Sequence, residues 1–258
     1  MIKIEKLTKV YDRNGEEATA LKDIDLEVHN GEILCVIGPS GCGKTSLLRI
    51  IAGLDKPTNG RATIEGKEIE NAGADRCMIF QESTLFPWRT AQKNIEFSLE
   101  IKGLDPQKRK ELSDQLIELV GLKGFEDAYP RQLSSGMKQR ISLARALASD
   151  PKVFLMDEPF GSLDAQTRNI MQKELLEIWR KNEKTILFVT HSVDEAVYLG
   201  DRVAILTARP GTLKKIIEVN LPRPRDRVGN EFTAIRKQIL QELEVEVERA
   251  SKQSRRTE

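Results

Sequence analysis

One stretch of the chain has residue types suited to holding a phosphate group. It is Gly38, Pro39, Ser40, Gly41, Cys42, Gly43, Lys44 and Thr45, followed by Ser46. Glycines let the backbone curl so that successive N–H groups point at an anion, and a helix starting after the loop adds the positive end of its dipole. Lys44 can bridge the β- and γ-phosphates, and the Thr45 hydroxyl can hold Mg²⁺. The spacing G-x-x-x-x-G-K-[ST] therefore predicts a nucleotide site for ATP and Mg²⁺, in an NTPase or a kinase.

Two adjacent carboxylates form the second candidate site. The apolar run 153–156 ends in Asp157 and Glu158. A carboxylate at the carboxyl end of a parallel strand can coordinate the Mg²⁺ that bridges the phosphates, and Asp157 suits that role through a water molecule. Glu158, one residue further, can orient or deprotonate an attacking water. A base that activates water favours hydrolysis over transfer to a second substrate.

The elements that must position these residues can be read from the hydrophobic pattern. Residues 2–11, 21–32 and 61–70 alternate between apolar and polar, which predicts half-buried antiparallel strands. Residues 33–38 form a continuous apolar run, typical of a strand buried on both faces, and 152–159 and 184–191 are two further apolar strand candidates. Helical spacing follows the glycine-rich loop and recurs at 107–122, 134–150 and 168–182. Alternation of strands and helices predicts an α/β fold with a mainly parallel sheet.

Composition limits the classes of protein. The chain has 258 residues, 41 Lys and Arg against 40 Asp and Glu, and a net charge of +1. This balance lacks the basic footprint of a nucleic-acid-binding domain, so no nucleic-acid partner is expected. Cys35, Cys42 and Cys77 fit no metal-ligand spacing and are interpreted as free thiols in a reducing compartment. The N-terminus lacks the apolar stretch of a signal peptide, and no apolar run approaches bilayer length, so a cytoplasmic location is expected.

A third motif begins the helical segment after residue 133. Leu133-Ser134-Ser135-Gly136-Met137-Lys138-Gln139-Arg140 resembles the signature sequence, usually LSGGQ, of ATP-binding-cassette (ABC) ATPases. The other positions that this family uses are present in order: Tyr11, Gln81, Ser162-Leu163-Asp164 and His191. Each of these residues alone would more often be structural. Their order around a phosphate loop makes the resemblance specific over about residues 1–215.

The resemblance implies a fold and a set of roles. The fold would be a P-loop NTPase core with an antiparallel β subdomain and an inserted α-helical subdomain at about 85–150, within an ATPase domain at 1–215. Beyond that domain, the residue pattern of 232–249 predicts an amphipathic helix within an extension at residues 216–258. Glu158 is then the general base, His191 the γ-phosphate sensor, and Lys44 and Gln81 further catalytic residues. The expected nucleotide contacts are Tyr11 on adenine, residues 38–46, Gln81, Ser134, Gly136 and Asp164, with Thr45, Gln81 and Asp157 at the metal.

The family also implies partners. Two copies would pair head to tail, with ATP between the phosphate loop of one and the signature of the other. The sequences before and after Gln81, the segment 206–211 and the Pro/Arg segment 221–227 look like the nitrate, sulfonate and taurine importer group. This implies an import ATPase on the inner face of the membrane, bound to a membrane-spanning permease and, indirectly, to a solute-binding protein. A soluble ABC ATPase not tied to transport and a P-loop kinase are the alternatives.

Two details stay open at the level of sequence. Phe86, Pro87 and Trp88 lie where such cassettes receive the permease, but the two aromatic side chains could equally be core. Ser135 and Met137 depart from the LSGGQ pattern. We expect Ser134 and the Gly136 backbone to carry the phosphate contact, with Ser135 facing away.

Overall fold

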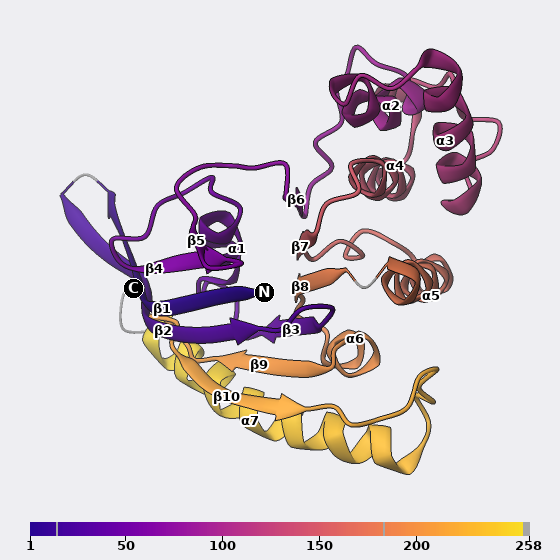
Figure 1. Cartoon of the computed structure of the whole chain (residues 1–258). Coiled ribbons are helices and arrows are strands. Elements are labelled where there is room, and N and C mark those ends of the chain that lie inside the picture. The colour runs from indigo at the N-terminus through magenta and orange to yellow at the C-terminus, as the bar shows by residue number, and fades with distance from the viewer. Residues whose placement is uncertain (14, 183, 255–258) are drawn as a thin grey trace. The chain divides into compact units, whose positions relative to one another are not determined.

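The computed structural model describes residues 1–13, 15–182 and 184–254, which form two compact units (Figure 1). Unit 1 comprises residues 1–73 and 183–258, and unit 2 comprises residues 74–182. The phosphate loop therefore belongs to unit 1, and the acidic pair belongs to unit 2.

Unit 1 begins with an antiparallel sheet. Its strands are β1 (Ile2–Arg13), β2 (Glu16–Val28), β4 (Asn59–Ile64) and β5 (Lys67–Glu68), in the order β2-β1-β4-β5. Ile2, Ile4 and Leu7 of β1 are buried. The alternation of apolar and polar residues predicted these strands, and the antiparallel pairing is confirmed.

The second sheet of unit 1 carries the phosphate loop. Its strands are β3 (Ile33–Ile37), β8 (Thr185–Val189), β9 (Arg202–Leu206) and β10 (Leu213–Glu218). β3 lies between β8 and β9 and is parallel to both. β10 pairs with β9 in the antiparallel direction and forms the edge strand. Every residue of β3 and β8 is buried, as continuous apolar runs require in a parallel sheet.

Three helices complete unit 1: α1 (Lys44–Ile51), α6 (Val193–Leu199) and α7 (Asn230–Ser254). α7 lies along β10 and α6 (Figure 1). It buries Phe232, Ile239 and Glu246, which recur every seven residues and so form one stripe along the helix. None of the described helices is long and apolar enough to cross a membrane.

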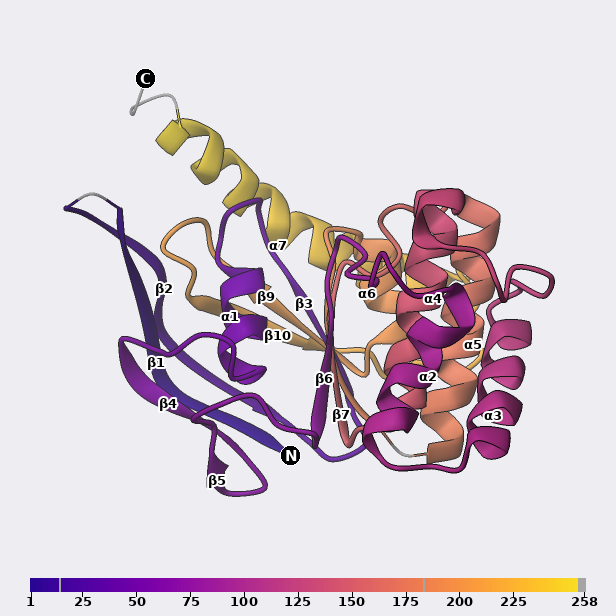
Figure 2. The ribbon, with the colours of Figure 1, turned by 90° about the horizontal axis from the view of Figure 1, so that it is seen from above.

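Unit 2 consists of two parallel strands and a group of helices. The strands are β6 (Arg76–Ile79) and β7 (Val153–Asp157), and the helices are α2 (Ala91–Ile101), α3 (Pro106–Leu119), α4 (Ser135–Ala148) and α5 (Ala165–Asn182). A 3-10 turn lies at Pro130–Gln132. α2, α3 and α4 pack against one another (Figure 2). Thr90, Asp105 and Ser134 begin these helices as N-caps, each accepting a backbone N–H bond.

The predicted fold class is confirmed: an antiparallel β part, parallel strands and inserted helices are all present. α2, α6 and the strands β6, β9 and β10 were not among the elements expected from the hydrophobic pattern. α6 and β6 have only seven and four residues, too few for a period to be recognised. The domain limits expected at residues 85–150 and 215 stay predictions.

Candidate functional site

The phosphate loop connects β3 to α1 by a backbone path that requires glycine. Gly41 and Gly43 have φ of +76° and +96°, in the left-handed region that glycine adopts without strain. A Cβ on Gly43 would lie 2.6 Å from Leu21 Cδ2 and 2.9 Å from the carbonyl oxygen of Ala20. Gly43 is also the N-cap of α1, so it offers no side-chain oxygen to the first N–H groups of that helix. The first backbone N–H groups of α1 can therefore bind an anion.

Lys44 lies folded over this loop. Its Nζ donates to the carbonyl oxygens of Gly38 (2.8 Å) and Pro39 (3.0 Å), and its side chain is buried. The Cys42 sulfur is 3.9 Å away. Burial raises the pKa of the Cys42 thiol, although the Lys44 charge acts against that shift, so the thiol stays neutral at physiological pH. The ammonium group is thereby held at the loop that would carry the phosphates.

Tyr11 is positioned next to α1 by polar contacts. Its hydroxyl oxygen is 2.9 Å from Asp55 Oδ2 and 3.1 Å from Ser46 Oγ. Lys9 Nζ lies 4.7 Å from the centre of the Tyr11 ring and donates to Asp55 Oδ1. Sequence reasoning did not single out Lys9 or Asp55, because nothing in their spacing distinguishes them from other surface charges.

His191 lies in unit 1, at the same edge of the parallel strands as the phosphate loop. β3 and β8 are parallel, and their register pairs Val36 with Val189, so both strands end together. His191 follows two residues after β8, and its side chain is exposed. Thr45, the first residue beyond Lys44 in α1, is exposed as well. Tyr11, the loop and His191 thus all belong to unit 1, with the loop and His191 at the carboxyl edge where α/β proteins bind ligands.

Unit 2 brings two predicted catalytic residues into contact. Asp157 is the last residue of β7 and is buried, and Glu158 follows it with φ +46°. Gln81 comes two residues after β6, which is parallel to β7, and its Nε2 donates to Glu158 Oε2 at 3.2 Å. A glutamate in left-handed backbone is strained by about 1–2 kcal/mol, and such residues concentrate at functional sites.

The signature motif begins α4, also in unit 2. Ser134 is the N-cap, and its hydroxyl accepts the Met137 N–H at 3.3 Å. A Cβ on Gly136 would lie 3.3 Å from Leu163 Cδ2, so the signature packs tightly against the segment containing Asp164. Asp164 in turn caps α5: the backbone N–H of Thr167 donates to its carboxylate, which lowers the pKa of Asp164.

The predicted site residues thus fall into two sets. Tyr11, residues 38–46 and His191 lie in unit 1, and Gln81, Ser134, Gly136, Asp157, Glu158 and Asp164 lie in unit 2. The three expected metal ligands are divided, with Thr45 in unit 1 and Gln81 and Asp157 in unit 2. The individual roles of these residues stay predictions.

Comparison with known proteins identifies the fold and the chemistry. Residues 21–161, more than half of the chain, match the protein family described as "ABC transporter". The chain belongs to the ABC transporter family. A solved dimeric ATP-binding cassette, in a post-hydrolysis state bound to ADP and Pi, aligns with a TM-score of 0.80 and 31% identity, covering 86% of this chain and 100% of that one. This member of the ABC family is accordingly an ATPase of the cassette fold.

Curated relatives of this ABC ATPase cover nearly its whole length. It is 59% identical to an uncharacterised ABC transporter ATP-binding protein of Methanocaldococcus jannaschii, over 95% of this chain and 92% of the relative. It is 50% identical to the aliphatic sulfonates import ATP-binding protein SsuB of Bacillus licheniformis, over 92% of this chain and 91% of that protein. With the nitrate import ATP-binding protein NrtD of Synechocystis it shares 44% identity, over 92% and 89% of the two chains.

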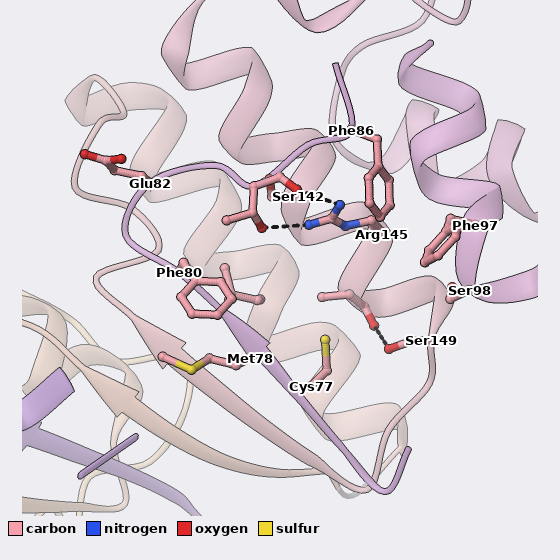
Figure 3. Close-up of a pocket in the computed structure, with 13 residues that line it drawn as sticks. Cys77, Met78, Phe80, Glu82, Phe86, Phe97, Ser98, Ser142, Arg145 and Ser149 are labelled. Atoms are coloured by element: carbon pink, nitrogen blue, oxygen red, sulfur yellow. Dashed lines mark hydrogen bonds between the residues drawn. The ribbon is translucent and has the colours of Figure 1, made fainter. Parts of the chain in front are cut away.

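Unit 2 of the ABC cassette also contains an apolar pocket of about 400 Å³ (Figure 3). β6 contributes Cys77, Met78 and Ile79, and α2 contributes Phe97 and Ser98. Ser142, Arg145 and Ala146 come from α4, and Ser149 is the C-cap of that helix. Phe86 lines the pocket as well, with its ring centre 4.6 Å from that of Phe97 and 5.5 Å from that of Trp88. Trp88 is 70% exposed, which excludes a core position for its ring. The question that the sequence left open is therefore settled for Trp88.

Proposed function

We propose that the chain is the ATP-hydrolysing subunit of an importer that takes up a small anionic solute. The observation that carries this proposal is the 44–50% identity with sulfonate and nitrate import ATP-binding proteins over 92% of the chain. Similarity over that length includes the C-terminal part as well as the nucleotide site. A soluble ABC ATPase outside transport and a P-loop kinase would not be expected to share it.

The phosphate loop would hold the nucleotide through its backbone and Lys44. The left-handed glycines turn N–H groups toward an anion, and the positive end of the α1 dipole adds to their attraction. The Lys44 ammonium now binds the carbonyl oxygens of Gly38 and Pro39. Phosphate oxygens carry more negative charge than carbonyl oxygens, so the ammonium would exchange these partners for the β- and γ-phosphates. The Tyr11 ring, tethered beside Ser46, is the proposed stacking surface for adenine.

The donor set fits a magnesium ion. Thr45 offers a hydroxyl and Asp157 a carboxylate, both of them the hard oxygen ligands that Mg²⁺ prefers, and Gln81 adds an amide oxygen. When bound, the ion would neutralise charge on the phosphates. Glu158 would accept the proton of the attacking water. Its hydrogen bond from Gln81 would keep the carboxylate oriented toward that water.

A second copy of the chain would complete the site. Ser134 and the backbone at Gly136 start α4, whose N-terminus would meet the γ-phosphate held by the other copy. His191 would report whether that phosphate is present. Loss of phosphate after hydrolysis removes the bridging charge, and the pair can then open.

The pocket of unit 2 is the proposed docking place for a membrane-spanning permease. It is mainly apolar, and the exposed Trp88 ring, next to the lining residue Phe86, extends the apolar surface. The Ser98 and Ser142 hydroxyls in its wall are buried, and neither has a hydrogen-bond partner among the described residues. A permease segment that enters the pocket could satisfy them. Docking there would hold the cassette at the cytoplasmic face of the membrane, and a solute-binding protein would deliver the cargo from the other side.

The test is reconstitution with the candidate permease. The chain and the permease would be purified together, placed in lipid vesicles with a binding protein, and supplied with ATP. We expect ATP-dependent accumulation of a labelled alkanesulfonate, taurine or nitrate, and no accumulation with the Glu158→Gln variant. A chain that hydrolyses ATP but forms no complex with any candidate permease would refute the importer proposal in favour of a soluble ATPase.

A further inference from the structure

The short helix α6 follows directly after His191 and depends on contacts from elsewhere in unit 1. It has seven residues, and an isolated helix of this length is unstable in water. Its last turn contains no basic residue that could bind the terminal carbonyl oxygens. The orientation of α6 is therefore set by whatever satisfies its two ends.

Three arginines of the segment 222–227, here called the arginine strap, meet α6: Arg223, Arg225 and Arg227. Arg225 is buried to 6% exposure and binds the C-terminal end of the helix. Its guanidinium donates to the carbonyl oxygens of Val197 (2.6 Å), Tyr198 (3.2 Å), Gly200 (2.5 Å) and Val219 (3.0 Å). Its charge thus lies at the negative end of the helix dipole. Burial lowers the pKa of Arg225 to about 10, which leaves the group charged at neutral pH.

The other two strap residues hold α6 at further points. Arg223 donates to the carbonyl oxygen of Leu199 and to Asp201 Oδ1, both at 2.6 Å. Arg227 donates to the carboxylate of Asp194 in the first turn, and its guanidinium lies 3.9 Å from the centre of the Tyr198 ring. The strap therefore contacts both the beginning and the end of α6.

The first turn of α6 is joined to the backbone of His191. Thr190 Oγ1 donates to Glu195 Oε2 (2.5 Å) and accepts the N–H of Ser192 (3.0 Å). Ser192 Oγ accepts the N–H of Glu195 (3.3 Å) and so caps the helix. His191 stands between two residues that are both bound to Glu195. A rotation or shift of α6 would therefore be transmitted to the His191 backbone.

We propose that the arginine strap is a positioning element for His191, acting through α6. The inference rests on the proposed role of His191 as the γ-phosphate sensor. It assigns a function to the Pro/Arg segment at 222–227, which would otherwise only connect β10 to α7. A strap that served only to attach the C-terminal helix would affect stability and leave His191 in place.

The chain has two histidines, so the position of His191 can be observed directly. NMR spectra of the imidazole groups of the full-length chain would show signals from His191 and His29, assigned with a His29→Gln variant. Arg227→Ala is the test variant, because this side chain is partly exposed and the chain should fold without it. Arg249→Ala is the matched control, since Arg249 pairs with Glu246 within α7. We expect Arg227→Ala to shift the His191 signal and leave that of His29, and Arg249→Ala to shift neither.

Kinetics provide the second readout. Arg227→Ala should lower kcat for ATP hydrolysis about tenfold, as small misplacements of a catalytic group do, with the Kd for ATP within about twofold of wild type. Arg227→Lys, which keeps the charge, should restore most of the rate. In a His191→Ala background, Arg227→Ala should have no further effect on the rate, because the residue it positions is gone.

The outcomes separate the two proposals. If His191→Ala hydrolyses ATP like wild type, the assigned role of His191 is wrong. If His191→Ala is impaired but Arg227→Ala leaves the His191 signal in place, or lowers the rate equally in both backgrounds, the strap is a stabilising contact only and the inference is overturned.

Discussion

Gly43 and Gly41 provide a matched pair that tests how tightly the phosphate loop is built. Both have positive φ, so alanine at either position forces an L-residue into left-handed backbone, at a cost of about 1–2 kcal/mol. They differ in the space around them. An added Cβ at Gly41 would meet nothing within 4 Å, whereas at Gly43 it would lie 2.9 Å from the carbonyl oxygen of Ala20.

That carbonyl oxygen cannot move without consequences. It accepts the N–H of Gly211 at 2.9 Å, and Gly211 in turn accepts the N–H of Lys22. Overpacking a filled site of this kind costs about 1–3 kcal/mol beyond the backbone strain. Gly41→Ala should therefore destabilise unit 1 by about 1–2 kcal/mol, and Gly43→Ala by about 2–5 kcal/mol.

Thermal unfolding of the nucleotide-free chain measures the difference. At about 2–4 °C per kcal/mol for a chain of this size, Gly41→Ala should lower Tm by about 2–8 °C, with Gly43→Ala at least a further 2 °C lower. Circular dichroism and calorimetry on both variants at one scan rate would make the comparison. Equal shifts for the two variants would show that Gly43 is not packed against Ala20 as described.

Three further predictions concern the nucleotide chemistry. Glu158→Gln should lower the rate of ATP hydrolysis roughly 10²–10⁴-fold, while ATP binding survives and a nucleotide-held dimer accumulates. Steady-state rates and gel filtration measure these effects. Near wild-type turnover would contradict the general-base role. Lys44→Ala should weaken ATP binding itself, measured by equilibrium titration, because the phosphates lose one positive charge. Gly136→Asp should block ATP-dependent pairing by placing a carboxylate against phosphate, whereas Ser135→Gly should change turnover only modestly. A fully active Gly136→Asp enzyme would show that the signature motif does not contact the γ-phosphate as proposed.

Local sequence patterns were sufficient to predict the phosphate loop and the buried strands around it. The loop is a contiguous set of residues whose chemistry depends on glycine, lysine and threonine at fixed spacing, and its neighbours in sequence supply the strand and helix it needs. The buried runs of β3, β7 and β8 could be predicted for the same reason, since burial on both faces gives a nearly continuous run of apolar residues. The short elements α6 and β6 could not, because seven and four residues are too few for a period to be recognised.

Contacts between segments far apart in the chain were decided only by the tertiary structure. The hydrogen bond between Gln81 and Glu158 spans 77 residues, and the one between Tyr11 and Asp55 spans 44. Neither can be inferred from the spacing of charged or polar residues, since many arrangements in space are compatible with one sequence pattern. The same holds for Arg225: its sequence context is a run of prolines and arginines, and only folding reveals that it binds the end of α6. The sequence by itself determined which chemical groups are present and the local backbone that holds the phosphate loop, because both depend on neighbouring residues. Folding decided which groups meet, because a contact depends on the path of the whole chain.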